Sequence, residues 1–236
     1  MKTVFKLTIG LFTLTCSTAF AASLRISPIK MQLADTQQAT SLSLFNESAE
    51  SNHLQIRVFK WVQKNNQDQL LATDDIVVSP PIVKLASNTA LNLRVVRQKP
   101  VALTDEHAYR VIIDELPHPI DRDTTDQSVN VLLRSSLPLF ISPKKSKAEL
   151  TANLKIQDKN GVIHISNSGG RHTFIKDLNL MDRSTNKTYK IKVNTINGYI
   201  LAKQQKEFLI EDPGFIYNPQ HTYKIKINTT DRNYEF

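Results

Sequence analysis

The sequence predicts an all-β protein made of two β-sandwich domains joined by a short linker. Three observations support this prediction. Apolar and polar residues alternate with a period of two along most of the chain, turn-forming residues separate the short runs, and no stretch carries the apolar stripe of an amphipathic helix. With 236 residues, the chain has room for two small domains.

The N-terminus has the pattern of a secretory signal peptide over residues 1–21. Two lysines precede an apolar run, Leu7–Leu14, which is too short to span a membrane, and Ala19-Phe20-Ala21 is a small-x-small cleavage signal. We expect cleavage after Ala21 and export of residues 22–236. Cys16 is the one cysteine and lies in this segment, so the exported chain forms no internal disulfide and depends on its core alone.

The first domain is predicted to span residues 22–142. Its strands are expected at Leu24–Ile26, Ser41–Phe45, Leu54–Trp61, Leu91–Val95 and Tyr109–Ile113, followed by an edge strand at about 129–140. Polar or proline-containing turns separate them, at Asn46–Asn52, Ser79-Pro80-Pro81 and Pro117–Gln127. Short strands and turns in this order are typical of a sandwich.

A polar, basic segment led by a proline, Ser142-Pro143-Lys144-Lys145-Ser146-Lys147, is predicted to link the domains. The second domain, residues 143–236, is again a series of expected strands: Leu150–Gln157, Val162–Ser166, Phe174–Asp182, Thr188–Asn194, Glu207–Ile210 and His221–Asn228. Gly169-Gly170 and Asn197-Gly198 are turn signals, and we expect a hairpin turn at the first of them.

The chain is basic, with 30 Lys and Arg residues against 22 Asp and Glu residues and a net charge of +8. Lysines cluster in the linker and along the second domain. A nucleic-acid surface has the same sign of charge. The expected export and the lack of interleaved aromatic residues favour a solvated basic face instead, so we predict no nucleic-acid partner.

The sequence lacks the arrangements typical of catalysis and metal binding. It contains no G-x-S-x-G motif, and its six histidines do not have the spacing of a metal pair. Two acidic clusters, Asp74-Asp75 and Asp121–Asp126, lie near expected turns and are more typical of solvated loops than of paired catalytic acids. We therefore predict that the protein is not an enzyme and has no catalytic residue, metal or cofactor.

Glu115 is unusual because it is in phase with Tyr109–Ile113, whose alternate residues should face the core. A carboxylate at such a position is unfavourable unless it is paired. Arg94, within the apolar run that starts at Leu91, is a candidate partner. Alternatively, the strand ends at Ile113 and Glu115 is exposed.

The run 129–140 is unusual because both of its faces are apolar. One phase contains Val129, Val131, Leu133, Leu137 and Leu139, and the other contains Leu132 and Phe140. A strand that is apolar on both faces needs two covers. One is its own core, and the other is the second domain or another protein. An uncovered edge of this kind is an aggregation hazard.

Three segments of the first domain resemble the periplasmic chaperones of the chaperone–usher pathway, which assemble pili. These segments are Ser79-Pro80-Pro81-Ile82-Val83-Lys84-Leu85, Leu91-Asn92-Leu93-Arg94-Val95 and Tyr109-Arg110-Val111-Ile112-Ile113-Asp114-Glu115-Leu116-Pro117. They are similar, in order and spacing, to the family's Pro-Pro strand, its Q-x-x-R-[VI] segment and its Y-R-[x]n-E-[IL]-P signature. The resemblance covers the whole exported chain and implies two immunoglobulin-like sandwiches in a boomerang arrangement.

The resemblance also implies a function. Such chaperones bind pilus subunits that lack the last strand of their sandwich, supply that strand by donor-strand complementation, and deliver the subunit to an outer-membrane usher. It assigns the subunit-binding strand to Val129, Val131, Leu133 and Leu137. It assigns to Lys30 the binding of the subunit's C-terminal carboxylate, and to Arg94, Glu115 and Asp212 a buried ion-pair network that orients the domains.

The chain departs from the family pattern at Pro138, where many members have a second basic residue just before Leu-Phe. This departure resembles the branch called archaic, or alternative. Arg134 on the same strand and Arg97 are the candidates for a second cation beside Lys30.

The implied partners are pilus or fimbrial subunits and an outer-membrane usher, in the periplasm and without membrane insertion. The sequence leaves open which pilus is built and whether the free chaperone caps its binding strand by dimerising. One alternative is a secreted β-sandwich pilin or adhesin subunit, which would usually carry an N-terminal donor extension and often a disulfide. Another is an exported carbohydrate-binding or hydrolytic protein, which needs clustered exposed aromatic residues or paired carboxylates; Trp61 is the single tryptophan.

Overall fold

The computed structural model describes residues 24–117, 131–157 and 160–236, and its regular structure there is entirely β-strand. No helix long and apolar enough to cross a membrane occurs in this part of the chain. The all-β prediction is confirmed. The predicted signal peptide, residues 1–21, and the predicted strand residue Val129 lie outside the described residues.

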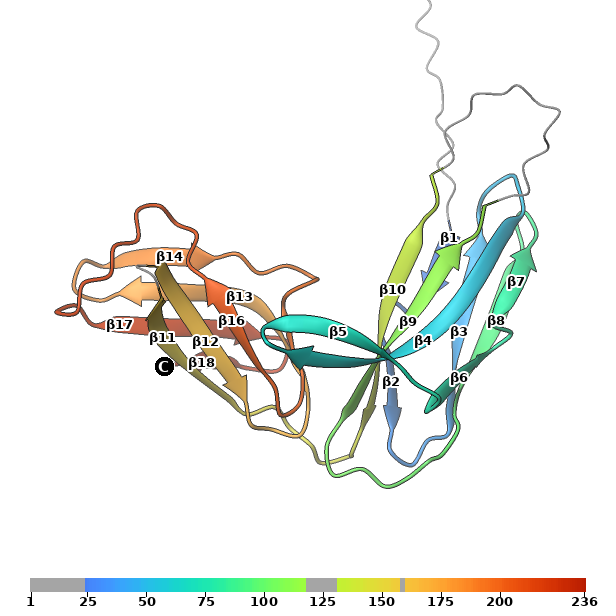
Figure 1. Cartoon of the computed structure of the whole chain (residues 1–236), viewed down its shortest axis with the longest axis horizontal. Helices are drawn as coiled ribbons and strands as arrows, with labels where there is room; N and C mark the ends of the chain where they lie inside the picture. Colours follow the sequence, from blue (N-terminus) through green and yellow to red (C-terminus); the bar gives the residue numbers. More distant parts are fainter. Residues whose placement is uncertain (1–23, 118–130, 158–159) are drawn as a thin grey trace, which may run out of the picture.

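The first sandwich is formed by ten strands (Figure 1). They are β1 (Leu24–Ser27), β2 (Met31–Ala34), β3 (Ala39–Asn46), β4 (Asn52–Lys64), β5 (Gln67–Ala72), β6 (Ile76–Ser79), β7 (Ile82–Leu85), β8 (Ala90–Arg97), β9 (His107–Glu115) and β10 (Arg134–Ser142). One sheet has the order β1-β3-β8-β6. The other has the order β2-β10-β9-β4-β5, and β7 also pairs with β4.

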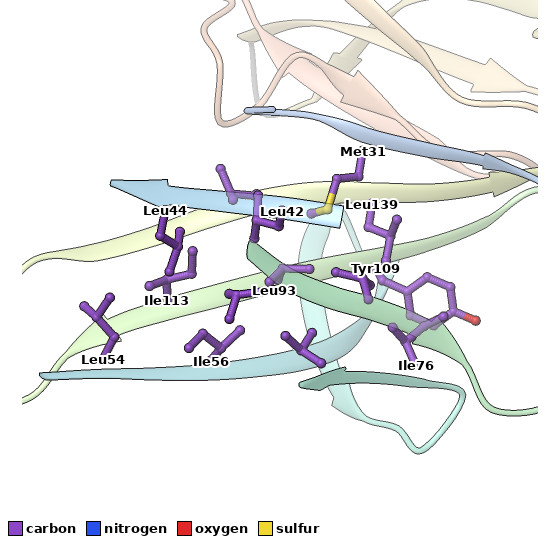
Figure 2. Close-up of a cluster of buried hydrophobic side chains, with 14 of the residues drawn as sticks. Met31, Leu42, Leu44, Leu54, Ile56, Ile76, Leu93, Tyr109, Ile113 and Leu139 are labelled. Carbon is purple, nitrogen blue, oxygen red and sulfur yellow. The ribbon is translucent and has the colours of Figure 1, made fainter. Parts of the chain in front are cut away.

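The apolar faces of these two sheets pack together as the first core. Figure 2 shows side chains of both sheets that meet there, among them Leu42, Leu44, Ile56, Leu93 and Leu139. They occupy alternate positions along their strands, which is the physical origin of the period-two pattern. Because Leu139 of β10 is fully buried among them, β10 is itself part of this core.

The second sandwich is formed by eight strands. They are β11 (Leu150–Gln157), β12 (Asn160–Asn167), β13 (Thr173–Asp182), β14 (Lys187–Ile191), β15 (Tyr199–Ile200), β16 (Gln205–Leu209), β17 (Tyr223–Thr229) and β18 (Asn233–Glu235). One sheet has the order β11-β12-β16 and the other β14-β13-β17-β18, with β15 also paired to β13. Isoleucines and leucines such as Ile163, Leu178 and Ile227 fill the core between them.

Gly169-Gly170 does not form the predicted hairpin turn. It lies between β12 and β13, which belong to different sheets, so the chain crosses from one sheet to the other at this point. A Cβ atom on Gly169 would clash with the backbone carbonyl oxygen of Lys147. The glycine is therefore needed for the close approach of this loop to the linker.

Strands β4 and β5 form a β-hairpin that was not predicted from the sequence. Lys64 pairs with Gln67, so only Asn65 and Asn66 form the loop, with φ angles of 52° and 61°. Two central residues with positive φ are typical of a type I′ turn, and asparagine tolerates that conformation better than most residues. The turn gives the hairpin a narrow tip.

The tip and the body of this hairpin contact the second sandwich (Figure 1). The Glu207 N–H donates to Asn66 Oδ1 at 2.7 Å. Gln63 is buried, donates through Nε2 to the Tyr199 carbonyl oxygen at 2.8 Å, and accepts from the Leu201 N–H at 3.0 Å. These hydrogen bonds join neutral side chains of the first sandwich to the backbone of the second, so they do not depend on side-chain charge.

Candidate functional site

β10 has an edge that is partly open. From Arg134 to Ile141 it pairs antiparallel with β9, but β2 pairs in parallel only with Leu139–Ser142. Within the described ranges, no strand pairs with that edge of β10 from Arg134 to Pro138. The unpaired backbone groups of such an edge can bind a strand from another chain.

Exposed apolar side chains precede this open edge. Val131 is 73% exposed, Leu132 48% and Leu133 47%. Two hydrogen bonds hold Leu133 beside the end of β9. The Glu115 N–H donates to the Leu133 carbonyl oxygen at 3.0 Å, and the Leu133 N–H donates to Glu115 Oε2 at 3.1 Å. The segment therefore extends the edge with side chains that the protein itself leaves exposed.

The structure corrects the prediction for Leu137. Its side chain is only 7% exposed and packs in the first core with Leu139 and Ile141. These three residues alternate along β10, so all of them point inward. Leu137 thus belongs to the protein's own core and does not offer its side chain to a partner.

The predicted ion pair between Arg94 and Glu115 is absent, which is a second correction. Arg94 lies on the exposed face of β8 because its neighbours Leu93 and Val95 point into the core. Glu115 does face inward, as its phase predicted, but its Oε1 is buried without a hydrogen-bond partner in the described structure and its Oε2 binds the Leu133 backbone. The two side chains belong to different sheets.

The other predicted basic residues are used within the first sandwich. Arg134 and Arg57 both pair with Asp114, and the Arg57–Asp114 distance is 2.7 Å. Burial opposes ionisation of Asp114, but hydrogen bonds from both arginines outweigh it and lower the pKa of the carboxyl. Arg97 is buried and donates to the carbonyl oxygens of Asp35, Gln37 and Val101. The guanidinium of Arg97 is thus used inside the first sandwich, whereas Arg134 contacts Asp114 only through Nε and its side chain stays 67% exposed.

Two cations flank Pro138 on the outer face of its sheet. Pro138 is paired with Arg110 of β9, and continuing the register of Leu139 with Met31 places Lys30 on its other side. The Arg110 guanidinium lies 3.7 Å from the ring centroid of Trp61. No carboxylate of the described residues lies within ion-pairing distance of Arg110. Burial lowers the pKa of its guanidinium.

Phe140, next on this face, is covered by the second sandwich. Its ring stacks on His172 with centroids 3.5 Å apart, and it forms a buried cluster with Trp61 and Leu201. Tyr199 packs against the same cluster, 5.3 Å from Trp61. The sequence predicted that both faces of this strand must be covered. At Phe140, the second domain covers the face that points away from the first core.

A buried carboxylate connects the two sandwiches beside this cluster. Glu106 accepts hydrogen bonds from the Ser142 hydroxyl at 2.5 Å, from the His172 N–H at 2.9 Å and from His172 Nδ1 at 2.5 Å. Lys30 donates to the other ring nitrogen of His172 at 3.0 Å. The Glu106 and His172 side chains are 1% and 4% exposed. A buried network of Glu106, His172 and Lys30 therefore connects the two domains, the role that was predicted for Arg94, Glu115 and Asp212.

Asp212 is distant from this network in the fold. Its carboxylate accepts the Gly214 N–H at 2.8 Å within the loop that follows β16. The described residues also contain no group of three or more His, Cys, Asp or Glu side chains that could hold a metal ion.

The charge states within the network follow from burial. Burial opposes ionisation of Glu106, but its hydrogen bonds with His172 and Ser142 outweigh it and lower the pKa of the carboxyl. For His172, burial lowers the pKa of the imidazole, and the hydrogen bond and negative charge of Glu106 raise it. Burial is the larger effect, so the pKa of the imidazole is lowered. Desolvation likewise lowers the pKa of Lys30. At neutral pH, ionised Glu106 thus accepts from neutral His172, whose second nitrogen accepts from Lys30.

We expect the free energy of unfolding to decrease as the pH falls below 6.5, the ordinary pKa of histidine. The unfolded chain protonates His172 at a higher pH than the folded chain does, so protons favour the unfolded state. Glu106 adds a loss of the same sign below its ordinary value of 4.5. Urea unfolding of the wild type and of His172→Asn between pH 7.5 and about 4 measures the difference. Identical pH slopes for the two proteins would contradict the assignment of His172.

The family of the chain is shown by comparison with known proteins. The family model of the PapD N-terminal domain, described as a pili and flagellar-assembly chaperone, matches residues 23–147. The chain belongs to this chaperone family. It is a pilus-assembly chaperone. Chaperones of this class are not enzymes, and they are periplasmic proteins.

A curated relative and several solved structures agree with this family. The chaperone is 24% identical to the chaperone protein SefB of Salmonella enteritidis over 188 residues, 75% of this chain and 70% of SefB. It matches a chain of the CsuC–CsuE chaperone–tip adhesion subunit complex of Acinetobacter baumannii with a TM-score of 0.68 at 22% identity, covering 91% and 97% of the two chains. It also matches a chain of the Salmonella enterica SafA pilin–SafB chaperone complex with a TM-score of 0.61 at 15% identity, covering 92% and 96%. The predicted fold of two immunoglobulin-like sandwiches is confirmed.

Three residues of this site, Arg110, Glu106 and His172, were not predicted from the sequence. For Arg110 a signal was present, because it is out of phase with Tyr109 and so must lie on the outer face of its strand. No local signal could identify the Glu106–His172 pair, since the two residues are separated by 66 positions and lie in different sandwiches.

Proposed function

We propose that this chaperone binds pilus subunits by donor-strand complementation through residues 131–138. The observation that supports the proposal most directly is the open edge of β10 from Arg134 to Pro138, preceded by the exposed Val131 and Leu133. A subunit that lacks the last strand of its own sandwich presents an apolar groove with unpaired strand edges. The chaperone edge supplies both the backbone groups and the side chains that such a groove needs.

The magnitudes are sufficient for stable binding. Burial of one Val or Leu side chain contributes roughly 1.5–3 kcal/mol, and each new ladder hydrogen bond about 0.5–1.5 kcal/mol. Ordering the subunit offsets part of this gain. Because the backbone pairing depends little on sequence, the same edge can serve several related subunits.

We infer that Lys30 and Arg110 together bind the C-terminal carboxylate of the subunit. Lys30 and Arg110 flank Pro138 on one face, so a carboxylate over Pro138 would lie between them. Arg110 in particular keeps its guanidinium donors free of carboxylates, and a planar guanidinium suits a bidentate carboxylate contact. Arg110 thereby replaces the basic residue that the family usually has at position 138.

The relatives support this function by what they bind. SafB was solved with the SafA pilin, and CsuC with the CsuE tip adhesion subunit of archaic pili. By analogy, we place this chaperone in the archaic branch, with an outer-membrane usher as the acceptor of its subunits. We further propose export by the signal peptide 1–21 with cleavage after Ala21, and domains at residues 22–142 and 143–236.

Removing either cation should weaken subunit binding. We expect Lys30→Ala and Arg110→Met each to reduce the affinity for a pilin by roughly 2 kcal/mol or more, because a buried carboxylate would lose an ionic partner. The measurement is co-purification from periplasmic extracts followed by titration of the purified subunit. Arg94→Ala, which removes an exposed arginine from the opposite sheet, is the matched control and should bind normally. If all three variants bind like the wild type, the carboxylate anchor lies elsewhere.

A further inference from the structure

The net positive charge of the chaperone resides in its second domain together with the linker that leads into it. Residues 143–236 contain 16 Lys and Arg residues against 9 Asp and Glu residues, a net charge of +7. Residues 22–142 contain 12 against 13, a net charge of −1. Since the proposed subunit site lies in the first sandwich, this charge is separate from subunit binding.

Within the second sandwich, lysines gather on the outer face of the sheet β14-β13-β17-β18. We call this surface the basic face. It consists of Lys176, Lys190, Lys224 and Lys226 on the strands and of Lys192, which directly follows β14. The lysines on β14 and β17 alternate with buried residues such as Ile191 and Ile225, so they point away from the second core.

The register brings these lysines close together. Lys190 and Lys226 both pair with Asn179, one from each side, so they lie in one row two strands apart, or about 10 Å. That separation is comparable to the Debye length of about 10 Å at 0.1 M salt, so their fields add. Lys176, Lys190 and Lys192 also line one shallow hollow of about 340 Å³ together with Asp177.

Few carboxylates neutralise the basic face. Glu235 pairs with Lys224 and lies 3.9 Å from Lys226. Lys176, Lys190 and Lys192 form no ion pair with any carboxylate of the described residues. The face thus combines five lysines with two acidic residues, Glu235 and Asp177.

The opposite sheet of the same sandwich does not share this charge. On its outer face, Lys155 lies 3.8 Å from Glu207, which also contacts His164. The remaining outward residues of β11 and β16, such as Thr151 and Gln205, are neutral. The excess positive charge of the second sandwich is therefore concentrated on one of its two outer faces. In a uniformly solvated basic protein it would be spread over both.

The chemistry of the basic face favours a diffuse anionic surface over an acidic protein. Protein interfaces are depleted in lysine and usually centre on aromatic or arginine anchors. The face carries no arginine or aromatic residue at its centre, and Met181 is its half-buried apolar residue. Lysine is a point charge that interacts with headgroup phosphates without strict geometry. Ile196, four residues after Lys192 in the loop that follows β14, is an apolar side chain that is 76% exposed.

We propose that the basic face docks the chaperone peripherally onto bilayers rich in anionic phospholipid. Docking uses the outer side of the second sandwich, so the open edge of β10 stays available. The protein lies on the headgroups and does not insert a strand or a helix. Such docking concentrates the chaperone at a membrane surface while it binds its subunits.

The test uses the chaperone purified from periplasmic extracts and vesicles of phosphatidylglycerol with phosphatidylethanolamine, in about 0.1 M salt. The wild type should sediment with these vesicles and not with purely zwitterionic ones. Each lysine near an anionic surface strengthens binding about fivefold, so the loss of three lysines in K176E/K190E/K192E should weaken binding on the order of a hundredfold, and repulsion by the three glutamates should weaken it further. All three lysines are exposed, and pilin binding by this variant should be unchanged.

The matched control is K144E/K145E/K147E, which changes the net charge equally at three exposed linker lysines. It should retain most of the vesicle binding. Equal losses in both variants, or no binding by the wild type, would overturn the proposal. Binding to polyglutamate that only the face variant loses, without vesicle binding, would assign the face to an acidic protein and would also overturn it.

Discussion

Leu133→Glu should abolish the rescue of pilus subunits while the chaperone itself stays folded. Leu133 is about half exposed and tied to Glu115 only through its backbone and the Glu115 carboxylate. In the complex, the substitution replaces a buried leucine, worth roughly 1.5–3 kcal/mol, with a carboxylate whose burial costs several kcal/mol more. An affinity loss of about a thousandfold or more follows.

The readout is the amount of pilin recovered from periplasmic extracts, together with the melting temperature of the variant. Leu132→Glu is the matched control, because Leu132 is equally exposed but points to the opposite face of the strand. It should keep most of the subunit yield. Normal pilin yield with Leu133→Glu would remove residues 131–138 from the proposed binding site, and an equal loss with Leu132→Glu would argue against strand pairing in this register.

Glu106→Ala should produce the largest loss of stability among single substitutions of charged residues in the described interface. The carboxylate is almost fully buried and accepts three hydrogen bonds from Ser142 and His172. Removing it leaves those donors without an acceptor and leaves Lys30 and Arg171 without their nearest negative charge. We expect a loss of about 3–5 kcal/mol, as for other broken buried pairs.

The loss can be measured by urea unfolding followed through the fluorescence of Trp61. This residue is the single tryptophan and packs in the interface between the sandwiches, so its emission reports on their separation. Asp105→Ala is the matched control. Asp105 precedes Glu106 and also faces a cation of the second sandwich, Lys203 at 3.7 Å, but its side chain is 39% exposed. Exposed pairs contribute about 0–1 kcal/mol, so a similar loss in both variants would refute the special role of Glu106.

The packing of Phe140 in this interface has a consequence for the proposed function. Phe140 is held between the two sandwiches while residues 134–138 of the same strand keep an open edge. One strand is thus anchored at its C-terminal end and free to pair at its N-terminal end. A preorganised strand of this kind loses less conformational entropy on binding than a mobile segment would.

Local patterns were sufficient for several predictions. The period-two alternation identified most long strands, the inward phase of Glu115 and the exposed apolar residues Val131 and Leu133. The hairpin strand β5 was missed because Leu70 and Leu71 are adjacent, which breaks the alternation, and because the Asn65-Asn66 turn was not recognised. Gly169-Gly170 was wrongly read as a hairpin turn, since a glycine pair does not reveal whether the flanking strands share a sheet.

Residue patterns were enough to predict an all-β protein with two sandwiches, whose first domain ends in a strand with apolar residues on both faces. These properties follow from the alternation of side chains along a strand, which involves only neighbouring residues. The folded chain was needed to show that Leu137 is buried, that Arg110 pairs with Pro138, and that Glu106 rather than Glu115 joins the sandwiches. Those properties depend on strand register and on contacts between distant segments, and alternation carries no information about either.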